Sequence, residues 1–197
     1  MSQATLAGFE AAEPTDRLFF ALFPDRDTAG RIAAFAAMQC ANHGLRGRPL
    51  STDRLHVTLF HLVDSVGLRD DVVRAAEQAA AQVRGAPFDV SFDQVATFAN
   101  RRRHKPFVLK SSGGNDPLHA FHAQLGRALS ATGLGRCVTA AFEPHVTLAY
   151  DARDVATEPV TPVSWRAGEF VLVHSLLGKT QHIPLARWAL DGSRLSA

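Results

Sequence analysis

The tetrapeptide His-Val-Thr-Leu occurs twice in this chain, at residues 56–59 and again at residues 145–148. Successive side chains of an extended strand point to opposite faces, so the histidine and the threonine of each copy share one face. The valine and the leucine share the other face, where they can pack into a core. The pattern predicts two buried strands that present His56 with Thr58, and His145 with Thr147, to a common cleft.

These residue types indicate a particular chemistry if the two strands face each other. One imidazole can remove a proton near neutral pH while the other supplies one, which is what acid–base catalysis at a phosphate requires. The alternative is that both segments are ordinary strands that happen to contain histidine. A single His-x-Thr is a weak signal, but two copies that also share valine and leucine favour the catalytic interpretation.

Strand and helix signals alternate around both copies, which lie 89 residues apart. We expect strands at 17–23, 55–63, 88–98, 106–110 and 144–150, and closing strands around Trp165 and at 169–177 and 181–190. Helices are expected at 25–42, at 68–83 and after the turn at 113–117. Asp25 is expected to cap the first helix, with Ile32, Phe35, Ala36 and Met38 on its apolar face. The arrangement suggests a diverged duplication, with two halves related by a pseudo-two-fold axis. Because no linker rich in Pro, Gly or Ser separates them, we expect one bilobal domain at 16–197, preceded by a flexible N-terminal arm at 1–15.

The composition is that of a globular protein of the cytoplasm. Of the 197 residues, 46% are hydrophobic and 20% are charged, and no apolar run approaches the roughly 18 residues of a membrane span. The two cysteines, Cys40 and Cys137, lie outside any CxxC motif, which is typical of reduced thiols. The net charge of +2 permits a polyanionic partner without requiring one. We expect a monomer without a membrane association.

Two His-x-Thr-x motifs in a chain of this size resemble the 2H phosphoesterase superfamily, and within it the bacterial RNA 2′,3′-cyclic phosphodiesterases, also called 2′-5′ RNA ligases. The resemblance covers nearly the whole chain beyond the N-terminal arm. It extends to the opening strand at 17–22 and to the closing segment, which includes Trp165, Ser175 and residues 184–190. The chain departs from the family at His61, where the family usually has Phe, and at Tyr150, where it often has Arg.

The resemblance implies an α+β fold in which two mainly antiparallel sheets face each other across a central cleft, with helices outside. It also implies opening of an RNA terminal 2′,3′-cyclic phosphate to a 2′-phosphate without a metal ion or cofactor, with weak 2′-5′ ligation as the reverse reaction. His56 would then be the proton donor, His145 the acceptor, and Thr58 and Thr147 the phosphate-binding residues. Two alternatives stay open: a phosphodiesterase for a small cyclic nucleotide or ADP-ribose cyclic phosphate, and a non-catalytic module that binds nucleotides or RNA.

Other polar and aromatic residues are weaker candidates for substrate binding. Each of them has a plain structural interpretation, as a solvated loop or as core packing. The set comprises Phe19, Phe20, Arg46, Arg48, Arg101, Arg102, Arg103, Lys105, Tyr150, Ser175, Lys179 and His182. His61 is expected on the strand face opposite His56, in a core or an interface. His119 and His122 are spaced for one helix face, but no third metal ligand is evident and no zinc motif is present, so we expect a solvated face there.

Overall fold

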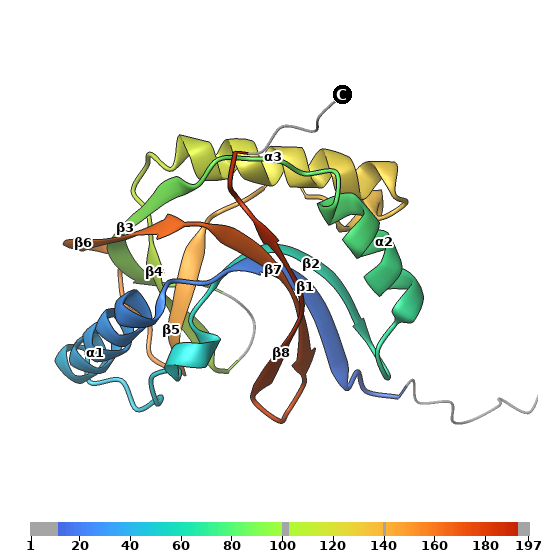
Figure 1. Cartoon of the computed structure of the whole chain (residues 1–197). Coiled ribbons are helices and arrows are strands. Elements are labelled where there is room, and N and C mark those ends of the chain that lie inside the picture. Colours follow the sequence, from blue (N-terminus) through green and yellow to red (C-terminus); the bar gives the residue numbers. More distant parts are fainter. Residues whose placement is uncertain (1–11, 100–102, 140, 193–197) are drawn as a thin grey trace, which may run out of the picture.

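One antiparallel sheet of eight strands forms the centre of the molecule, in the order β6-β3-β4-β5-β2-β1-β7-β8 (Figure 1). The computed structural model describes residues 12–99, 103–139 and 141–192. The strands are β1 (Asp16–Leu22), β2 (Val57–Ser65), β3 (Phe88–Thr97), β4 (Lys105–Lys110), β5 (His145–Asp151), β6 (Glu158–Ala167), β7 (Glu169–Leu176) and β8 (Gln181–Ala189). The helices are α1 (Arg26–Asn42), α2 (Asp70–Ala80) and α3 (Asp116–Ala131), with short 3₁₀ turns η1 (Thr52–Arg54) and η2 (Gly135–Cys137).

The expectation of two separate sheets is wrong, although the α+β class is confirmed. The two halves of the sheet, β6-β3-β4-β5 and β2-β1-β7-β8, meet where β5 lies beside β2. Val57 with Val146 is the one residue pair recorded between these strands in the described part of the chain. These valines are equivalent members of the two tetrapeptide repeats. A single recorded pair therefore joins the two halves into one sheet.

The two halves repeat the same local unit. The segment β1-α1-β2 places the first repeat on one side of the join, and β4-α3-β5 places the second repeat on the other side. In both units the two strands are antiparallel neighbours. The sheet order therefore reads symmetrically outward from the β2–β5 join, which brings the two histidines to the middle of the molecule.

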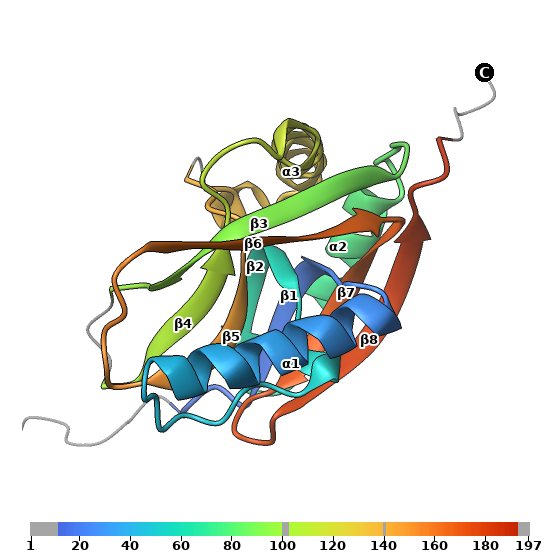
Figure 2. The same ribbon diagram turned by 90° about the vertical axis from the view of Figure 1, so that its left-hand side faces the viewer.

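The helices lie on different sides of the strands. The strands separate α1 from α2 and α3 in both views of the molecule (Figures 1 and 2). The Asp25 side chain caps α1 as expected, by accepting a 2.9 Å hydrogen bond from the backbone N–H of Thr28. Ile32 and Ala36 of α1 are fully buried, but Met38 is 51% exposed, so its expected place on the apolar face is wrong. Among the described residues, no helix is both long and apolar enough to cross a membrane.

Irregular pairing between β1 and β2 changes which side chains face the cleft. Ala21 pairs with Thr58 and Phe19 pairs with His61, so a step of two residues on β1 matches a step of three on β2. Such a bulge inserts one extra residue and shifts the alternation of faces. Leu59 and Phe60 are consequently both buried, and His61 emerges on the face of Thr58. The predicted opposite placement of His61 is therefore wrong.

Candidate active site

Both tetrapeptide repeats contribute to one pocket of about 290 Å³ at the join between the two halves of the sheet. His56 and Thr58 line it from the first half, and His145 and Thr147 line it from the second. The remaining lining residues are Arg17, Phe19, Leu50, Arg54, His61, Pro106, Tyr150, Ser175, Leu177 and His182. The predicted convergence of two imidazoles and two hydroxyl groups is thus present in the structure.

The two histidines are held in the same way. Nδ1 of His56 lies 2.7 Å from the carbonyl oxygen of Arg54, and Nδ1 of His145 lies 2.7 Å from the carbonyl oxygen of Glu143. Each carbonyl belongs to the residue two positions before the histidine. Because a carbonyl oxygen only accepts, Nδ1 carries the proton in each neutral ring. Both Nε2 atoms therefore remain available for proton transfer.

Aromatic rings surround His56 and lower its pKa. Phe19 stacks on the imidazole with 5.0 Å between ring centroids, and Phe23 and His182 lie at 5.5 and 5.2 Å. Burial lowers the pKa of His56 to about 3, and the charges of His182, His145 and Arg54 act in the same direction. The hydrogen bond to the Arg54 carbonyl oxygen opposes them. Free of ligand, this imidazole is neutral at pH 7.

The environment of His145 includes groups that favour its protonated form. Burial lowers its pKa, and the charge of Lys110 acts in the same direction. The carbonyl and the carboxylate of Glu143 both oppose that shift. The Phe98 ring contacts the imidazole edge-on at 4.8 Å. The two histidines are therefore matched in hydrogen bonding but unequal in electrostatics.

Arg54 contributes a guanidinium group that lacks a partner among the described residues. Its Nε is buried without a hydrogen bond, as is Nδ1 of His182. Arg17, the other arginine of the pocket, donates two hydrogen bonds of 2.7 and 2.6 Å to Asp64. Asp64 also lies 2.8 Å from Nε2 of His61, and these contacts hold its pKa well below the usual range. Arg54 is therefore the guanidinium of this pocket that forms no ion pair with a carboxylate of the described residues.

The weaker candidates divide into three groups. Four of them, Phe19, Tyr150, Ser175 and His182, line the pocket. Six lie elsewhere: Phe20, Arg46, Arg48, Arg103, Lys105 and Lys179. Arg101 and Arg102 are outside the described residues.

Local structure explains why five of those six lie outside the pocket. Phe20 alternates with Phe19 and is fully buried in the main core against Phe170 and Trp188. Lys105 is paired with Asp154 at 2.7 Å, and Lys179 is exposed in the turn between β7 and β8. Arg46 and Arg48 flank Gly47, where any Cβ would overlap the carbonyl oxygen of Tyr150. This close approach fixes the loop against β5, while both arginine side chains stay exposed.

Sequence reasoning missed several residues of the pocket. Arg54 stands two positions before His56, and its role depends on the η1 turn that the sequence pattern did not reveal. His61 was predicted on the wrong face because the alternation of side chains along a strand does not reveal the bulge in the pairing of β1 with β2. Arg17 alternates with Phe19 along β1, so it was recoverable once Phe19 was assigned to the cleft.

Of the two histidines on α3, His119 is exposed as expected, whereas His122 is packed among aromatic rings. His122 lies between Phe60 and Phe142 at centroid distances of 4.0 and 3.8 Å, and its Nε2 lies 3.1 Å from the Leu59 carbonyl oxygen. His122 is only 8% exposed, so the expected solvated face is wrong at this position. Within the described ranges, no group of three or more His, Cys, Asp or Glu side chains is arranged to hold a metal ion.

Comparison with known proteins gives the same family that the two motifs suggest. Residues 24–178 match the protein family described as the "2′-5′ RNA ligase superfamily". The chain belongs to the 2′-5′ RNA ligase superfamily. Membership of this superfamily, the 2H phosphoesterases, confirms the resemblance that the repeats carry.

Three further matches extend the comparison to about nine-tenths of the chain. The RNA 2′,3′-cyclic phosphodiesterase of Escherichia coli (strain K12) is 27% identical over 185 residues, which cover 91% of this chain and 98% of that protein. The crystal structure of E. coli LigT complexed with 3′-AMP has a TM-score of 0.68 at 27% identity and covers 91% of this chain and 99% of LigT. A crystal structure described as a phosphoesterase has a TM-score of 0.70 at 26% identity, with 90% and 99% covered.

Proposed function

We propose that this protein hydrolyses the terminal 2′,3′-cyclic phosphate of RNA to a 2′-phosphate by acid–base catalysis with His56 and His145, without a metal ion. The strongest support is the matched pair of Nδ1 contacts, which leaves Nε2 of both imidazoles available at one small pocket. Membership of the superfamily and the likeness to an E. coli RNA 2′,3′-cyclic phosphodiesterase support the same reaction.

The two imidazoles divide the proton transfers. Nε2 of His145 removes a proton from a water molecule as the water oxygen forms a bond to phosphorus. The bond from phosphorus to the ribose 3′-oxygen breaks, and Nε2 of His56 donates its proton to that oxygen. The products are a 2′-phosphate and a free 3′-hydroxyl. His145 is left protonated and His56 neutral, so one proton exchange with solvent resets the pair.

Charge that develops on the phosphate needs donors in fixed positions. Thr58 and Thr147 place one hydroxyl group beside each histidine, on two strands that are neighbours in the sheet. Arg54 adds a charged donor whose Nε has no acceptor among the described residues. A bound phosphodiester anion would give this guanidinium its missing partner.

The low pKa of His56 sets a condition on this mechanism. His56 must carry a proton to act as the acid, yet burial lowers its pKa to about 3 in the ligand-free pocket. A phosphate anion against Nε2 favours the charged ring and raises that pKa. His56 thus becomes an acid only when the substrate is bound, and the ligand-free pocket does not hold a second unpaired charge beside that of Arg54.

A small cyclic nucleotide is the second candidate substrate. The pocket volume of about 290 Å³ lies at the lower end of the range for small-ligand sites. LigT, the E. coli relative, has been crystallised with 3′-AMP. A cyclic mononucleotide therefore fits the same pair of histidines, and weak 2′-5′ ligation would be the reverse of the same steps.

The test compares two substrates with purified protein. An RNA oligomer that ends in 2′,3′-cyclic phosphate and the corresponding cyclic mononucleotide are each incubated with the enzyme, with and without EDTA. We expect turnover of the oligomer, a lower kcat/KM for the mononucleotide, and no effect of EDTA. Absence of turnover for both would refute the proposed function, and inhibition that a divalent ion reverses would refute metal independence.

A further inference from the structure

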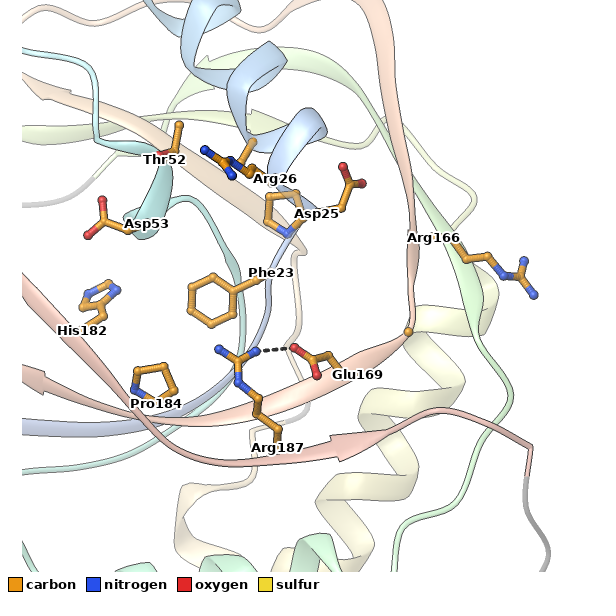
Figure 3. Close-up of a pocket in the computed structure, with 13 residues that line it drawn as sticks. Phe23, Asp25, Arg26, Thr52, Asp53, Arg166, Glu169, His182, Pro184 and Arg187 are labelled. Atoms are coloured by element: carbon orange, nitrogen blue, oxygen red, sulfur yellow. Dashed lines mark hydrogen bonds and ion pairs between the residues drawn. The ribbon is translucent and has the colours of Figure 1, made fainter.

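A second cavity adjoins the histidine pocket and shares a wall with it. This cavity, of about 620 Å³, lies between the start of α1, the η1 turn and the β7–β8 edge of the sheet (Figure 3). His182 lines both cavities. Phe23 lines the larger one, and its ring lies 5.5 Å from the His56 ring. A ligand that fills the histidine pocket can therefore continue past His182 and Phe23 without leaving the surface of the protein.

The larger cavity combines an aromatic surface with guanidinium groups. The Phe23 ring, which is half-buried, occupies the middle of the cavity, with Arg26 on one side of it and Arg187 on the other in the close-up (Figure 3). An aromatic ring on which a base stacks, next to cations that contact phosphates, is the usual means of holding single-stranded nucleic acid. Arg166 also lines the cavity, but its guanidinium group points away from it in this view.

The acidic residues of the cavity are mostly engaged by the protein itself. Asp25 accepts hydrogen bonds from the backbone N–H and the hydroxyl group of Thr28, which fixes it as the cap of α1. Glu169 forms an ion pair with Arg187. The Arg26 side chain has no ion pair or hydrogen bond with any other described residue, and Asp53 is the one carboxylate here without such a partner. Arg26 is thus a guanidinium group available to a phosphate.

We propose that this cavity is a second nucleotide subsite, which holds the nucleotide on the 5′ side of the cyclic end. The base would stack on Phe23, and Arg26 would contact the phosphodiester that links it to the terminal nucleotide. The inference rests on the proposed function and deepens it, because a second subsite gives a structural reason for preferring oligonucleotide ends to free cyclic nucleotides. A 5′ neighbour is favoured over a second strand because hydrolysis needs only water, whereas every RNA end has a 5′ neighbour.

The test measures kcat/KM for uridine 2′,3′-cyclic phosphate and for a uridine trinucleotide with the same cyclic end. Stacking of one base on an aromatic ring corresponds to roughly 5- to 150-fold in affinity, so we expect the wild type to prefer the trinucleotide by about tenfold or more. Arg26→Gln should reduce the ratio of the two kcat/KM values at least about fivefold, and Phe23→Leu should reduce it as well. Arg31→Gln is the matched control, because Arg31 lies on the same helix but outside the lining of both cavities.

The outcomes separate this inference from the proposed function. If the wild type opens neither substrate, the proposed function itself fails. If it opens both with the same kcat/KM, and Arg26→Gln changes neither value, only the second subsite is refuted. A third arm adds 5′-hydroxyl UpU to the mononucleotide reaction. One result would overturn the assignment of the subsite to the 5′ neighbour on the same strand. In that result the wild type shows no preference for the trinucleotide, but UpU inhibits the reaction or is ligated, and this effect disappears in Arg26→Gln.

Discussion

Binding of an anion should force a proton onto the buried histidine pair, and sulfate is a suitable probe because it keeps its charge between pH 5 and 8. His56 has a pKa of about 3 in the free pocket. Half-protonation at pH 7 needs a rise of about four pKa units, which corresponds to about 5.4 kcal/mol of differential interaction. A hydrogen bond to a charged group contributes about 1.5–3 kcal/mol, so a sulfate that contacts the His56 imidazole supplies part of that rise. The sulfate also offsets the charge of Arg54, which lowers the pKa of His56 in the free pocket.

Proton uptake has a defined sign in the sulfate experiment. The sulfate complex binds more protons than the free protein, so the affinity must increase as the pH falls. We expect the Kd for sulfate to change up to about tenfold per pH unit for each proton taken up. Titration calorimetry at pH 6 in two buffers with different ionisation enthalpies measures the number of protons directly.

Two variants make the sulfate experiment specific. His56→Gln should reduce the proton uptake, whereas His119→Gln, on α3 and outside the pocket lining, should leave it unchanged. Nitrogen NMR of the imidazoles should show the His56 ring neutral without sulfate and charged with it. Sulfate that competes with substrate but binds without proton uptake, at a Kd independent of pH, would refute the assignment of His56 as an acid that the bound anion creates.

Three further predictions concern the catalytic pair, the unpaired guanidinium group and acid stability. His56→Ala and His145→Ala should each lower kcat at least about a hundredfold, and the double variant should be little worse, because the two act as a unit; near-wild-type turnover in either would contradict the mechanism. Arg54→Gln should weaken sulfate binding about 10- to 100-fold, with partial recovery in Arg54→Lys; equal affinities by calorimetry would exclude Arg54 from the anion site. Burial lowers the pKa values of His56, His145, His182 and His122, so the folded state binds fewer protons than the unfolded state and stability should fall as the pH drops below about 6.5. Each of these histidines adds at most about 1.4 kcal/mol per pH unit to that slope, and urea unfolding curves with equal or higher stability at pH 5.5 than at pH 7.5 would contradict the shifts.

The repeats allowed the centre of the site to be predicted because the information is local. His56 and Thr58, and likewise His145 and Thr147, share a strand face through simple alternation. The two identical tetrapeptides also indicated that their strands lie close together, and the strands are neighbours at the Val57–Val146 pair. The cap at Asp25 was equally local, because it depends on a side chain and a backbone N–H three residues apart.

The missed features depend on contacts between distant segments. The bulges of β2 arise only against β1, so the exposure of His61 could not be read from its own strand. Strand β6 was expected only around Trp165, because this edge strand contains Pro159 and Pro162 and exposes many of its residues. His122 resembles a surface histidine in the helical pattern until Phe142, which follows α3 in the chain, covers its ring.

Analysis of the product tests the central claim most directly. An RNA oligomer with a 2′,3′-cyclic phosphate end is treated with the wild-type protein, and phosphorus NMR resolves the cyclic, 2′- and 3′-phosphate ends. We predict conversion of the cyclic phosphate to a 2′-phosphate with the wild type and no conversion with the variant in which both His56 and His145 are alanine. A cyclic end that persists with the wild type would contradict the proposed reaction, and a 3′-phosphate product would contradict protonation of the 3′-oxygen by His56.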